Sequence, residues 1–288
     1  MTTAITWATA VILFKKSGES VHPIALNLFK NLMAVILLVP TMYIMGESFL
    51  VSVNNNEYLI LFISGAVGIG VADTLFFMSL NRLGASLMAI IDCLYTPFVI
   101  GMSFIFLGER LNFIQIIGVV LIISAILTTA QPKVRVGVSG KNLALGITFG
   151  ALSMLANAGG IVLVKPILDK LPLLWVTEMR LLSGTVMLAL VLLFHPGRGR
   201  ILNSLHSLGS WPYTLVGSFF GAYLSMVFWL GGMKFTEASI SAPLNQTSNI
   251  WIFLLAAIFL KEAMNRQKTL AIIMAVIGVF IITFGKTW

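Results

Sequence analysis

Charged residues are scarce in this sequence of 288 residues: they make up 10% of it, whereas hydrophobic residues make up 58%. A typical soluble domain has about 25% charged residues, so this chain could not cover a surface that faces water. The composition therefore excludes a soluble globular protein and indicates an integral membrane protein with several spans. The net charge of +8 does not indicate a nucleic-acid partner, because the basic residues form no cluster with interleaved aromatic residues.

Cysteine and histidine are also rare. Cys93 is the single cysteine, which excludes an internal disulfide and a metal cluster held by cysteines. The three histidines, His22, His195 and His206, are far apart and near expected loops, so no metal site is expected. The glycines of residues 65–70 lie inside an apolar run and lack the strand-to-helix context of a nucleotide loop, so no cofactor is expected. No basic leading segment with a cleavage site precedes the first apolar run, which argues against a signal peptide.

Apolar runs, in contrast, are long and numerous. A helix needs about 20 apolar residues to cross the bilayer, and lipid offers loose backbone groups no other partner. We therefore predict an all-α integral membrane protein with ten transmembrane helices. Only 15 residues extend from the start of the sequence to the first charged position, Lys15, which is fewer than the roughly 20 that a span needs. The first helix is therefore predicted to be short or truncated. The predicted spans are about residues 4–17, 23–45, 58–80, 85–107, 112–130, 142–165, 172–194, 212–233, 238–260 and 267–285.

The second half of the chain repeats the first. Identical residues recur 153 positions apart, and the polar matches, in short breaks between apolar runs, are hard to explain by chance. We predict a first five-helix repeat over residues 1–130, a linker over residues 131–141 and a second repeat over residues 142–288. An odd number of spans per repeat inverts one half relative to the other, as in many secondary transporters. The matches are Ala85/Ala238, Ser86/Ser239, Ala89/Ala242, Phe106/Phe259, Leu107/Leu260, Glu109/Glu262 and Asn112/Asn265.

This pattern resembles the EamA-type family of the drug/metabolite transporter superfamily. The resemblance covers almost the whole chain and rests on Lys30 and Arg180, 150 positions apart early in the second helix of each half, and on the Ala-Ser and Phe-Leu-x-Glu motifs of the repeat. It implies a multi-pass transporter of the cell (inner) membrane that exports a small metabolite, such as an amino acid. The sequence departs from the pattern in its short first helix, in Lys261 where the first half has Gly108, and in Lys30 where the second half has Arg180.

The orientation in the membrane receives two conflicting predictions. Connections after odd-numbered spans carry eleven Lys and Arg, and those after even-numbered spans carry five; the other two of the 18 lie inside spans. The positive-inside rule would therefore place both termini outside the cell. The family resemblance implies that both termini are cytoplasmic, and we favour that orientation.

Five ionisable residues lie well inside predicted spans, where a charge costs at least about 2.5–3.5 kcal/mol and needs a partner, a wet cavity or a route to the interface. At 1.5 Å per residue, the first half places Lys30, Asp73 and Asp92 about 12 Å below one membrane face. The second half brings further polar residues to a similar depth from the other face. We predict two polar layers around the midplane, where transporters bind substrate. The second-half residues are Glu178, Arg180, Asn157 and Asn245, the last being the repeat mate of Asp92.

Simpler roles remain open for these residues. Lys30 and Arg180 could extend along their helices to the interface, or Lys30 could neutralise Asp73 or Asp92. Asp92 has the strongest functional case: it precedes Pro97, which interrupts helical hydrogen bonding, and a carboxylate in a dry cavity suits proton binding and release. The candidates for the cavity wall, each of which could equally be a packing residue or an interface anchor, are Tyr95, Phe76, Trp229 and Trp251.

Two further sets of residues are predicted to be structural. Glu109 and Glu262 sit at helix junctions, where each is expected to accept backbone N–H bonds at the start of the next helix. The spaced glycine pairs Gly146/Gly150 and Gly217/Gly221 are expected to be helix-packing surfaces.

The function predicted from these residues is secondary active transport by alternating access, with the lipid bilayer and a small-molecule substrate as partners. The acidic and basic layers would suit a zwitterion, and proton coupling through Asp92, helped by Asp73, is a hypothesis. The alternatives are an exporter of cationic or lipophilic drugs, an intramembrane aspartyl protease that uses Asp73 and Asp92 as a dyad, and a signalling or scaffold protein. The oligomeric state is left as monomer or homodimer.

Overall fold

The structure is a computed structural model that describes residues 2–107, 112–129, 139–235 and 245–285. These residues form helices, turns and short loops, without strands in the part described. The helices are α1 Thr2–Ser17, α2 Pro23–Met45, α3 Asn55–Gly65, η1 Ala66–Val71, α4 Ala72–Leu83, α5 Ala85–Asp92, α6 Tyr95–Leu107, α7 Phe113–Thr129, α8 Gly140–Lys170, α9 Leu173–Phe194, α10 Arg198–Asn203, η3 Ser204–His206, η4 Leu208–Ser210, α11 Trp211–Ser218, η5 Phe219–Ser225, α12 Met226–Phe235, α14 Ser248–Phe259 and α15 Arg266–Phe284.

Six continuous helical segments in the described residues are long and apolar enough to cross a membrane. They are Pro23–Met45, Asn55–Leu83, Ala85–Phe106, Gly140–Lys170, Leu173–Phe194 and Trp211–Phe235, and shorter apolar helices cover Phe113–Thr128 and Ser248–Phe259. The prediction of an all-helical protein with several spans is therefore confirmed, whereas ten spans in two inverted repeats stay a prediction. The predicted span 238–260 lies partly outside the described residues.

Helix boundaries follow local signals in the sequence. His22 caps the start of α2, where Pro23 occupies the first turn, and Gly46 ends the helix at a φ of 70°, a conformation that glycine adopts without strain. One predicted boundary was wrong: α8 continues to Lys170, beyond the predicted end at residue 165, with Pro166 inside the helix. The connection between α9 and α11 has about the predicted length and contains α10 and two short 3₁₀ helices.

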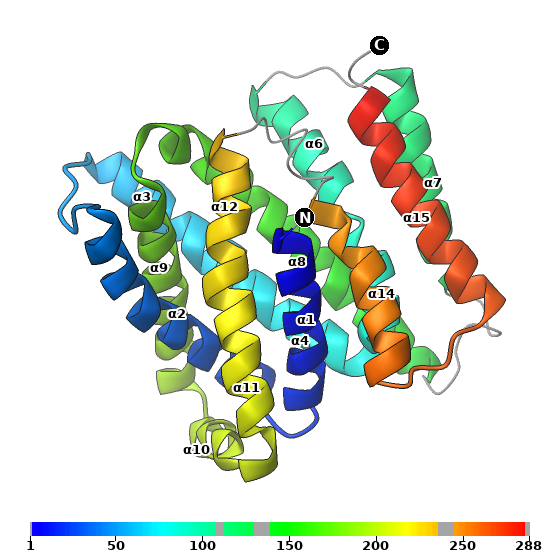
Figure 1. Cartoon of the computed structure of the whole chain (residues 1–288), viewed down its shortest axis with the longest axis horizontal. Helices are drawn as coiled ribbons and strands as arrows, with labels where there is room; N and C mark the ends of the chain where they lie inside the picture. The colour runs from blue at the N-terminus through cyan, green and yellow to red at the C-terminus, as the bar shows by residue number, and fades with distance from the viewer. Residues whose placement is uncertain (1, 108–111, 130–138, 236–244, 286–288) are drawn as a thin grey trace.

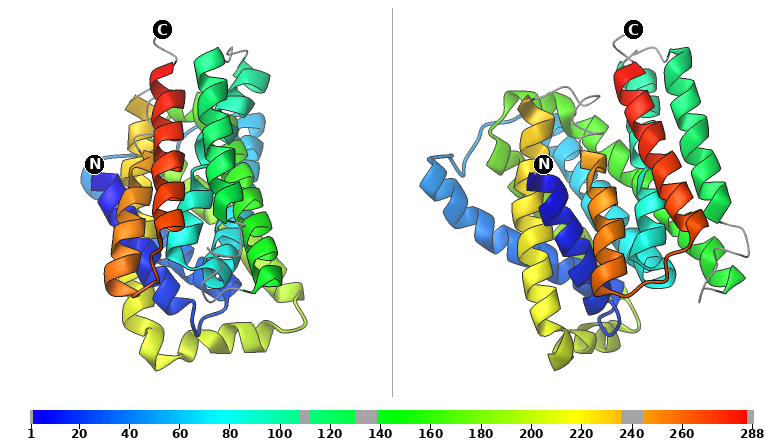
Figure 2. Two further views of the ribbon diagram at one scale, coloured as in Figure 1. Left: turned by 90° about the vertical axis from the view of Figure 1, so that its right-hand side faces the viewer. Right: turned by 45° about the vertical axis from the view of Figure 1, so that its right-hand side comes forward.

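The helices form a bundle in which distant segments of the chain pack side by side (Figure 1). α2 packs against α9, α4 against α8, and α7 against α15. The views in Figure 2 show α7 and α15 as an antiparallel pair at one side of the bundle. Large apolar side chains cover the outside, for example Ile36, Ile105 and Phe113. Such a surface is stable against lipid tails and not against water.

Two helices change to a wide π-helical turn midway. The first is η1, between α3 and α4, and the second is η5, between α11 and α12. Ala66 and Phe219, where these turns begin, are 153 positions apart. A π-turn leaves backbone carbonyls without their usual helical partner and often marks a functional site. The offset of 153 positions that relates the two halves of the sequence thus also relates the two π-helical turns.

A second matched irregularity interrupts the helices that follow. α5 ends at Asp92 and α6 begins at Tyr95, because Pro97 has no N–H to bond the carbonyl of Cys93 four residues earlier. α14 begins at Ser248, which is 153 positions after Tyr95. Both halves therefore break a helix at corresponding positions in the bundle.

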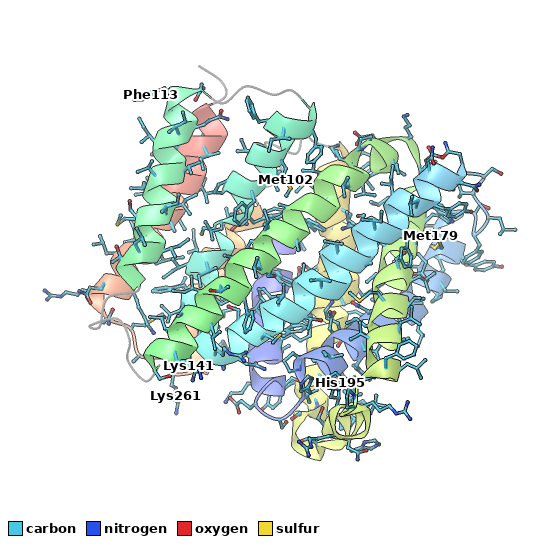
Figure 3. The ribbon with its side chains drawn as sticks, turned by 180° about the vertical axis from the view of Figure 1, so that it is seen from behind. Met102, Phe113, Lys141, Met179, His195 and Lys261 are labelled. Carbon is cyan, nitrogen blue, oxygen red and sulfur yellow. The ribbon has the colours of Figure 1, made fainter. Side chains whose placement is uncertain are left out.

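α8 and the helix that contains η1 run side by side, as Figure 3 shows from behind, and their backbones approach closely at Gly160. Ser64 donates a 2.7 Å hydrogen bond to the carbonyl of Gly160. A Cβ atom on Gly160 would lie 2.8 Å from the Cα of Gly68 and 3.0 Å from the carbonyl oxygen of Ser64. Only glycine fits here without movement of a backbone.

The close approach of the two backbones at Gly160 gives a first prediction. Gly160→Ala is expected to lower the free energy of unfolding by about 1–3 kcal/mol, the usual cost of overpacking. Gly159→Ala is the matched control, because its Cβ would meet only the end of Met102, at 3.5 Å, and alanine favours the helix. Unfolding in mixed micelles would compare the two variants, and equal stability of both would contradict the close approach.

Candidate functional site

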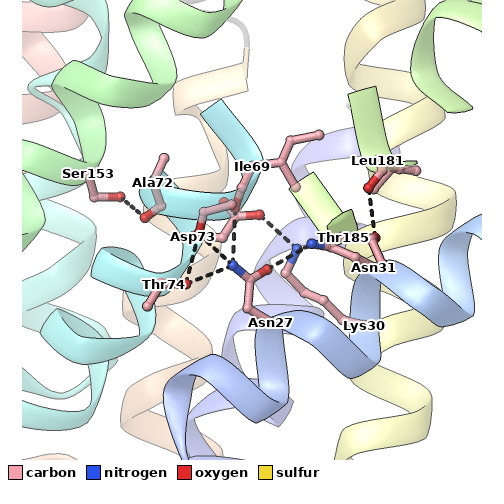
Figure 4. Close-up of polar contacts among 11 residues, drawn as sticks. Asn27, Lys30, Asn31, Ile69, Ala72, Asp73, Thr74, Ser153, Leu181 and Thr185 are labelled. Carbon is pink, nitrogen blue, oxygen red and sulfur yellow. Dashed lines mark hydrogen bonds and ion pairs between the residues drawn. The ribbon is translucent and has the colours of Figure 1, made fainter. Parts of the chain in front are cut away.

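Lys30 and Asp73 form an ion pair inside the bundle (Figure 4). The Nζ of Lys30 lies 2.7 Å from Oδ2 of Asp73 and 2.7 Å from Oδ1 of Asn31. Lys30 is 2% exposed, so it does not extend to the interface. Of the roles that the sequence left open, the structure therefore shows neutralisation of Asp73.

The same cluster ties the π-turn η1 to α2. Nδ2 of Asn27 donates to the carbonyls of Ile69 and Gly70, at 3.1 and 3.0 Å, and to Oγ1 of Thr74 at 3.0 Å. Asn27 thereby satisfies carbonyls that the wide turn displaces from regular helical bonding. The π-turn and the ion pair next to it are one hydrogen-bonded unit (Figure 4).

A cavity of about 110 Å³ lies beside this unit. Its wall combines charged, amide and hydroxyl groups with aromatic rings, and it comes from α1, α2, α4, α5, α6, α8, η5, α12, α14 and the residues just before α14. The predicted residues that line it are Lys30, Asp73, Asp92, Asn157, Asn245, Phe76, Tyr95 and Trp229. Lining residues that the sequence reasoning did not select include Thr3, Trp7, Ser153, Ser225, Met226, Gln246 and Ser248.

Asp92 is the last residue of α5 and lies at the interruption before α6. It lines the cavity. Within the described part of the chain, no lysine, arginine or histidine nitrogen lies within 4.0 Å of its carboxylate. Asp92 and Asp73 therefore differ in kind, because Asp73 has a lysine partner.

Hydrogen bonds join the interruptions of the two halves. Nδ2 of Asn249, in the first turn of α14, donates to Sγ of Cys93 at 3.4 Å and also to Oε1 of Gln246. Cys93 follows Asp92 directly. Cys93 is thus a buried packing and hydrogen-bonding residue at the point where the halves meet.

Three predicted site residues do not line the cavity. Arg180 is 1% exposed and its guanidinium lies 5.9 Å from the centre of the Trp229 ring; it does not extend to the interface as one alternative had it. Glu178 is buried two residues away, and positions i and i+2 do not share a face of a helix. Trp251 is 37% exposed, because the buried stripe of α14 runs through Ser248, Ile252 and neighbouring positions instead.

Glu262 was predicted to accept bonds from the start of the next helix in the chain, and this prediction was wrong. Glu262 accepts bonds from the backbone N–H groups of Ala85, at 2.6 Å, and Ser86, at 3.0 Å. These groups begin α5, in the other half, rather than the next helix. Unpaired N–H groups and the helix dipole make that N-terminus attractive to a carboxylate. Lys15 and Lys268 line the polar depression around it. Glu109, its repeat mate, lies outside the described residues.

The missed cavity residues had a signal in the sequence. Trp7 lies 150 positions before Asn157, and Gln246 lies 153 positions after Cys93. Each would have been selected if the repeat offset had been applied to every residue near a polar candidate. The glycine pair Gly217 and Gly221 packs against Phe14 as predicted, but Gly221 also lines the cavity, which the prediction did not include.

Comparison with known proteins agrees with this architecture. A curated relative from Archaeoglobus fulgidus, described as an uncharacterized transporter, is 24% identical over 288 residues, with 98% of this chain and 95% of the relative covered. A solved crystal structure, described only as that of a protein, shares the fold with a TM-score of 0.68 at 16% identity, with 97% of this chain and 95% of the other covered. The sequence matches the EamA-like transporter family over residues 1–131 and 144–284. The chain therefore belongs to the EamA-like transporter family and is a membrane transporter with several transmembrane helices.

Proposed function

We propose that this protein is a secondary active transporter that exports a small polar metabolite, such as an amino acid, by alternating access between two inverted five-helix halves. The observation that carries the proposal is the composition of the cavity wall: twelve of its 17 residues form six pairs of repeat mates. At an offset of 150 they are Thr3/Ser153 and Trp7/Asn157; at an offset of 153 they are Asp73/Met226, Phe76/Trp229, Asp92/Asn245 and Tyr95/Ser248.

Such pairing is expected if a pseudo-two-fold axis passes through the cavity, since the axis would bring each residue and its mate to the same place. The paired π-turns and the paired helix interruptions support the same axis. Transporters built from inverted repeats bind substrate near the membrane midplane, where interrupted helices offer backbone groups. The cavity lies at such interruptions in both halves.

Contacts at one membrane face support the alternating-access part of the proposal. Glu262 binds the start of α5 at this face, and Nζ of Lys15, at the end of α1, donates to the carbonyl of Asn81 at 3.1 Å. The cavity instead reaches Thr3, near the other end of α1. These polar contacts between segments far apart in sequence are of the kind that an outward–inward transition would break.

Asp92 is our candidate for the coupling site. A carboxylate without a cationic partner inside the bilayer is stabilised either by a proton or by a positively charged group of the substrate. Competition between the two would couple a proton that enters to a substrate that leaves. Asp73 is less suited to this exchange, because Lys30 stabilises its charged form.

A panel of radiolabelled metabolites in proteoliposomes, with and without an imposed pH gradient, would test the proposal. We expect counterflow of at least one small polar metabolite, and its accumulation against a gradient when the pH gradient is present. Absence of any movement across a panel of amino acids, amines and organic acids would refute it.

An exporter of cationic or lipophilic drugs is the second candidate, because Trp7, Phe76 and Trp229 give the cavity an aromatic wall beside Asp92. Competition separates the two: amino acids should displace a bound metabolite, whereas organic cations should displace a drug. The aspartyl-protease alternative is not supported, because Asp73 binds Lys30 rather than sharing a proton with a second aspartate.

A further inference from the structure

Arg180 is a buried cation that forms no salt bridge with the residues that the structure describes, since none of their carboxylate oxygens lies within 4.0 Å of it. The charge of Asp73, which is already paired with Lys30, acts on it only from beyond that distance. Within the same described residues, its Nε and Nη1 atoms have no hydrogen-bond partner, although the side chain is 1% exposed. A charged group inside the bilayer costs several kcal/mol unless it is paired, so this arrangement is incomplete.

The repeat explains why the counterion is missing. Arg180 lies 150 positions after Lys30, and Met226 lies 153 positions after Asp73. The first half therefore has a lysine and an aspartate, 2.7 Å apart, where the second half has an arginine and a methionine. The second half therefore has a cation at this position but an apolar side chain where the first half has the cation's partner, and that side chain lines the cavity.

The guanidinium lies next to the cavity wall. It stacks over Trp229 with 5.9 Å between Cζ and the ring centre, and it interacts electrostatically with Tyr95. Trp229 and Tyr95 both line the cavity. Within the described part of the chain, the hydroxyl of Tyr95 has no hydrogen-bond partner either, and this side chain is 5% exposed. Tyr95 thus offers an unpaired donor on the cavity wall, and Arg180 offers two more next to Trp229 of that wall.

We propose that Arg180 and Tyr95 form a subsite for the carboxylate group of the substrate. A guanidinium matches a carboxylate with two parallel N–H···O bonds, and the tyrosine hydroxyl supplies one more donor. Asp92, three residues before Tyr95 on the same cavity wall, is a separate group that is left to bind an ammonium group or a proton. This inference rests on the proposed function, because it assigns a ligand to the transport cavity.

Matched ligands test the subsite. L-Phenylalanine, phenethylamine and 3-phenylpropionate share one aromatic group but differ in whether they carry the carboxylate, and L-leucine, 3-methylbutylamine and 4-methylpentanoate form an aliphatic set. Binding to purified protein would be measured by calorimetry. Arg180→Met is expected to weaken the binding of the two amino acids and the two acids about 10- to 100-fold, which is the usual cost of losing a hydrogen bond to a charged group. The two amines should bind Arg180→Met and the wild type equally.

Two further variants separate binding from structure. Met226→Asp restores the counterion that the first half has, so it should weaken carboxylate binding as Arg180→Met does while raising the melting temperature of the ligand-free protein. Ser183→Ala, one turn further along α9, removes only a bond from Oγ to the carbonyl of Met179 and should leave carboxylate binding unchanged. If Arg180 were merely structural, Arg180→Met would lower the melting temperature without ligand.

The outcomes also separate this subsite from the proposed function. If the wild type transports an amine, if Arg180→Met leaves that transport unaltered, and if the wild type prefers none of the four carboxylate-bearing compounds, the subsite is overturned and the transporter function stands. Binding of none of the six compounds by the wild type would likewise count against the subsite. Failure of the wild type to move any solute in proteoliposomes would overturn the proposed function itself.

Discussion

Asp92→Asn is expected to abolish accumulation driven by a pH gradient while leaving exchange of substrate across the membrane measurable. Asparagine has nearly the same shape as aspartate but cannot take up a proton. The cavity would therefore still open and close with substrate bound, but no proton movement would drive the cycle in one direction. Proteoliposomes with an imposed pH gradient, assayed for net accumulation and for counterflow, measure both activities in one preparation.

The control for this variant is Asp169→Asn. It makes the same chemical change at a carboxylate that is 47% exposed at the side chain and pairs with Lys165 within one helix, outside the cavity wall. We expect normal accumulation. Accumulation by Asp92→Asn at the wild-type level would remove Asp92 from the coupling mechanism, and loss of both accumulation and counterflow would show a general defect instead.

Lys30→Met should cause the largest loss of stability. It leaves the Asp73 carboxylate, 14% exposed at its side chain, without its partner, and breaking a buried pair in this way costs about 3–5 kcal/mol. The double variant Lys30→Met/Asp73→Leu removes both charges and should recover most of the loss. The free energy of unfolding in mixed micelles is the measurement.

Lys165→Met provides a comparison for Lys30→Met, because its pair with Asp169 is partly exposed on one helix. Pairs of this type contribute about 0–1 kcal/mol. If the double variant at Lys30 and Asp73 proved as unstable as Lys30→Met, the loss would come from packing rather than from an unpaired charge.

Much of the helical architecture could be predicted from the sequence. Apolar length locates α2 and α9 almost to the residue, because in lipid a run of this length has no alternative to a helix. The calculation of depth also placed Lys30 and Asp73 at the same level in the membrane, since each residue adds a fixed rise of about 1.5 Å along a straight helix. The predicted inversion of the halves is an additional hypothesis, supported by the mates around the cavity.

Other features depend on tertiary contacts that no local pattern reveals. The π-turn η1 lies in an uninterrupted apolar run, and it is stabilised by Asn27, more than 40 positions away. Glu262 was assigned to the next helix because capping is usually local, but its partner is the N-terminus of α5. The side chain of Arg180 points over the ring of Trp229 rather than along its own helix to the interface, and this direction depends on how α9 packs against α12.

Site-directed labelling of one residue from both sides of the membrane tests the central claim most directly. In a Cys93→Ala background, Met226→Cys places the single thiol on the cavity wall, and Ile36→Cys, 68% exposed on the outer surface, places it against lipid. We predict that a membrane-impermeant thiol reagent modifies Met226→Cys in both right-side-out and inside-out vesicles, much faster than Ile36→Cys. Modification of Met226→Cys from neither side, or at the rate of Ile36→Cys, would contradict a water-filled cavity that opens alternately to the two faces.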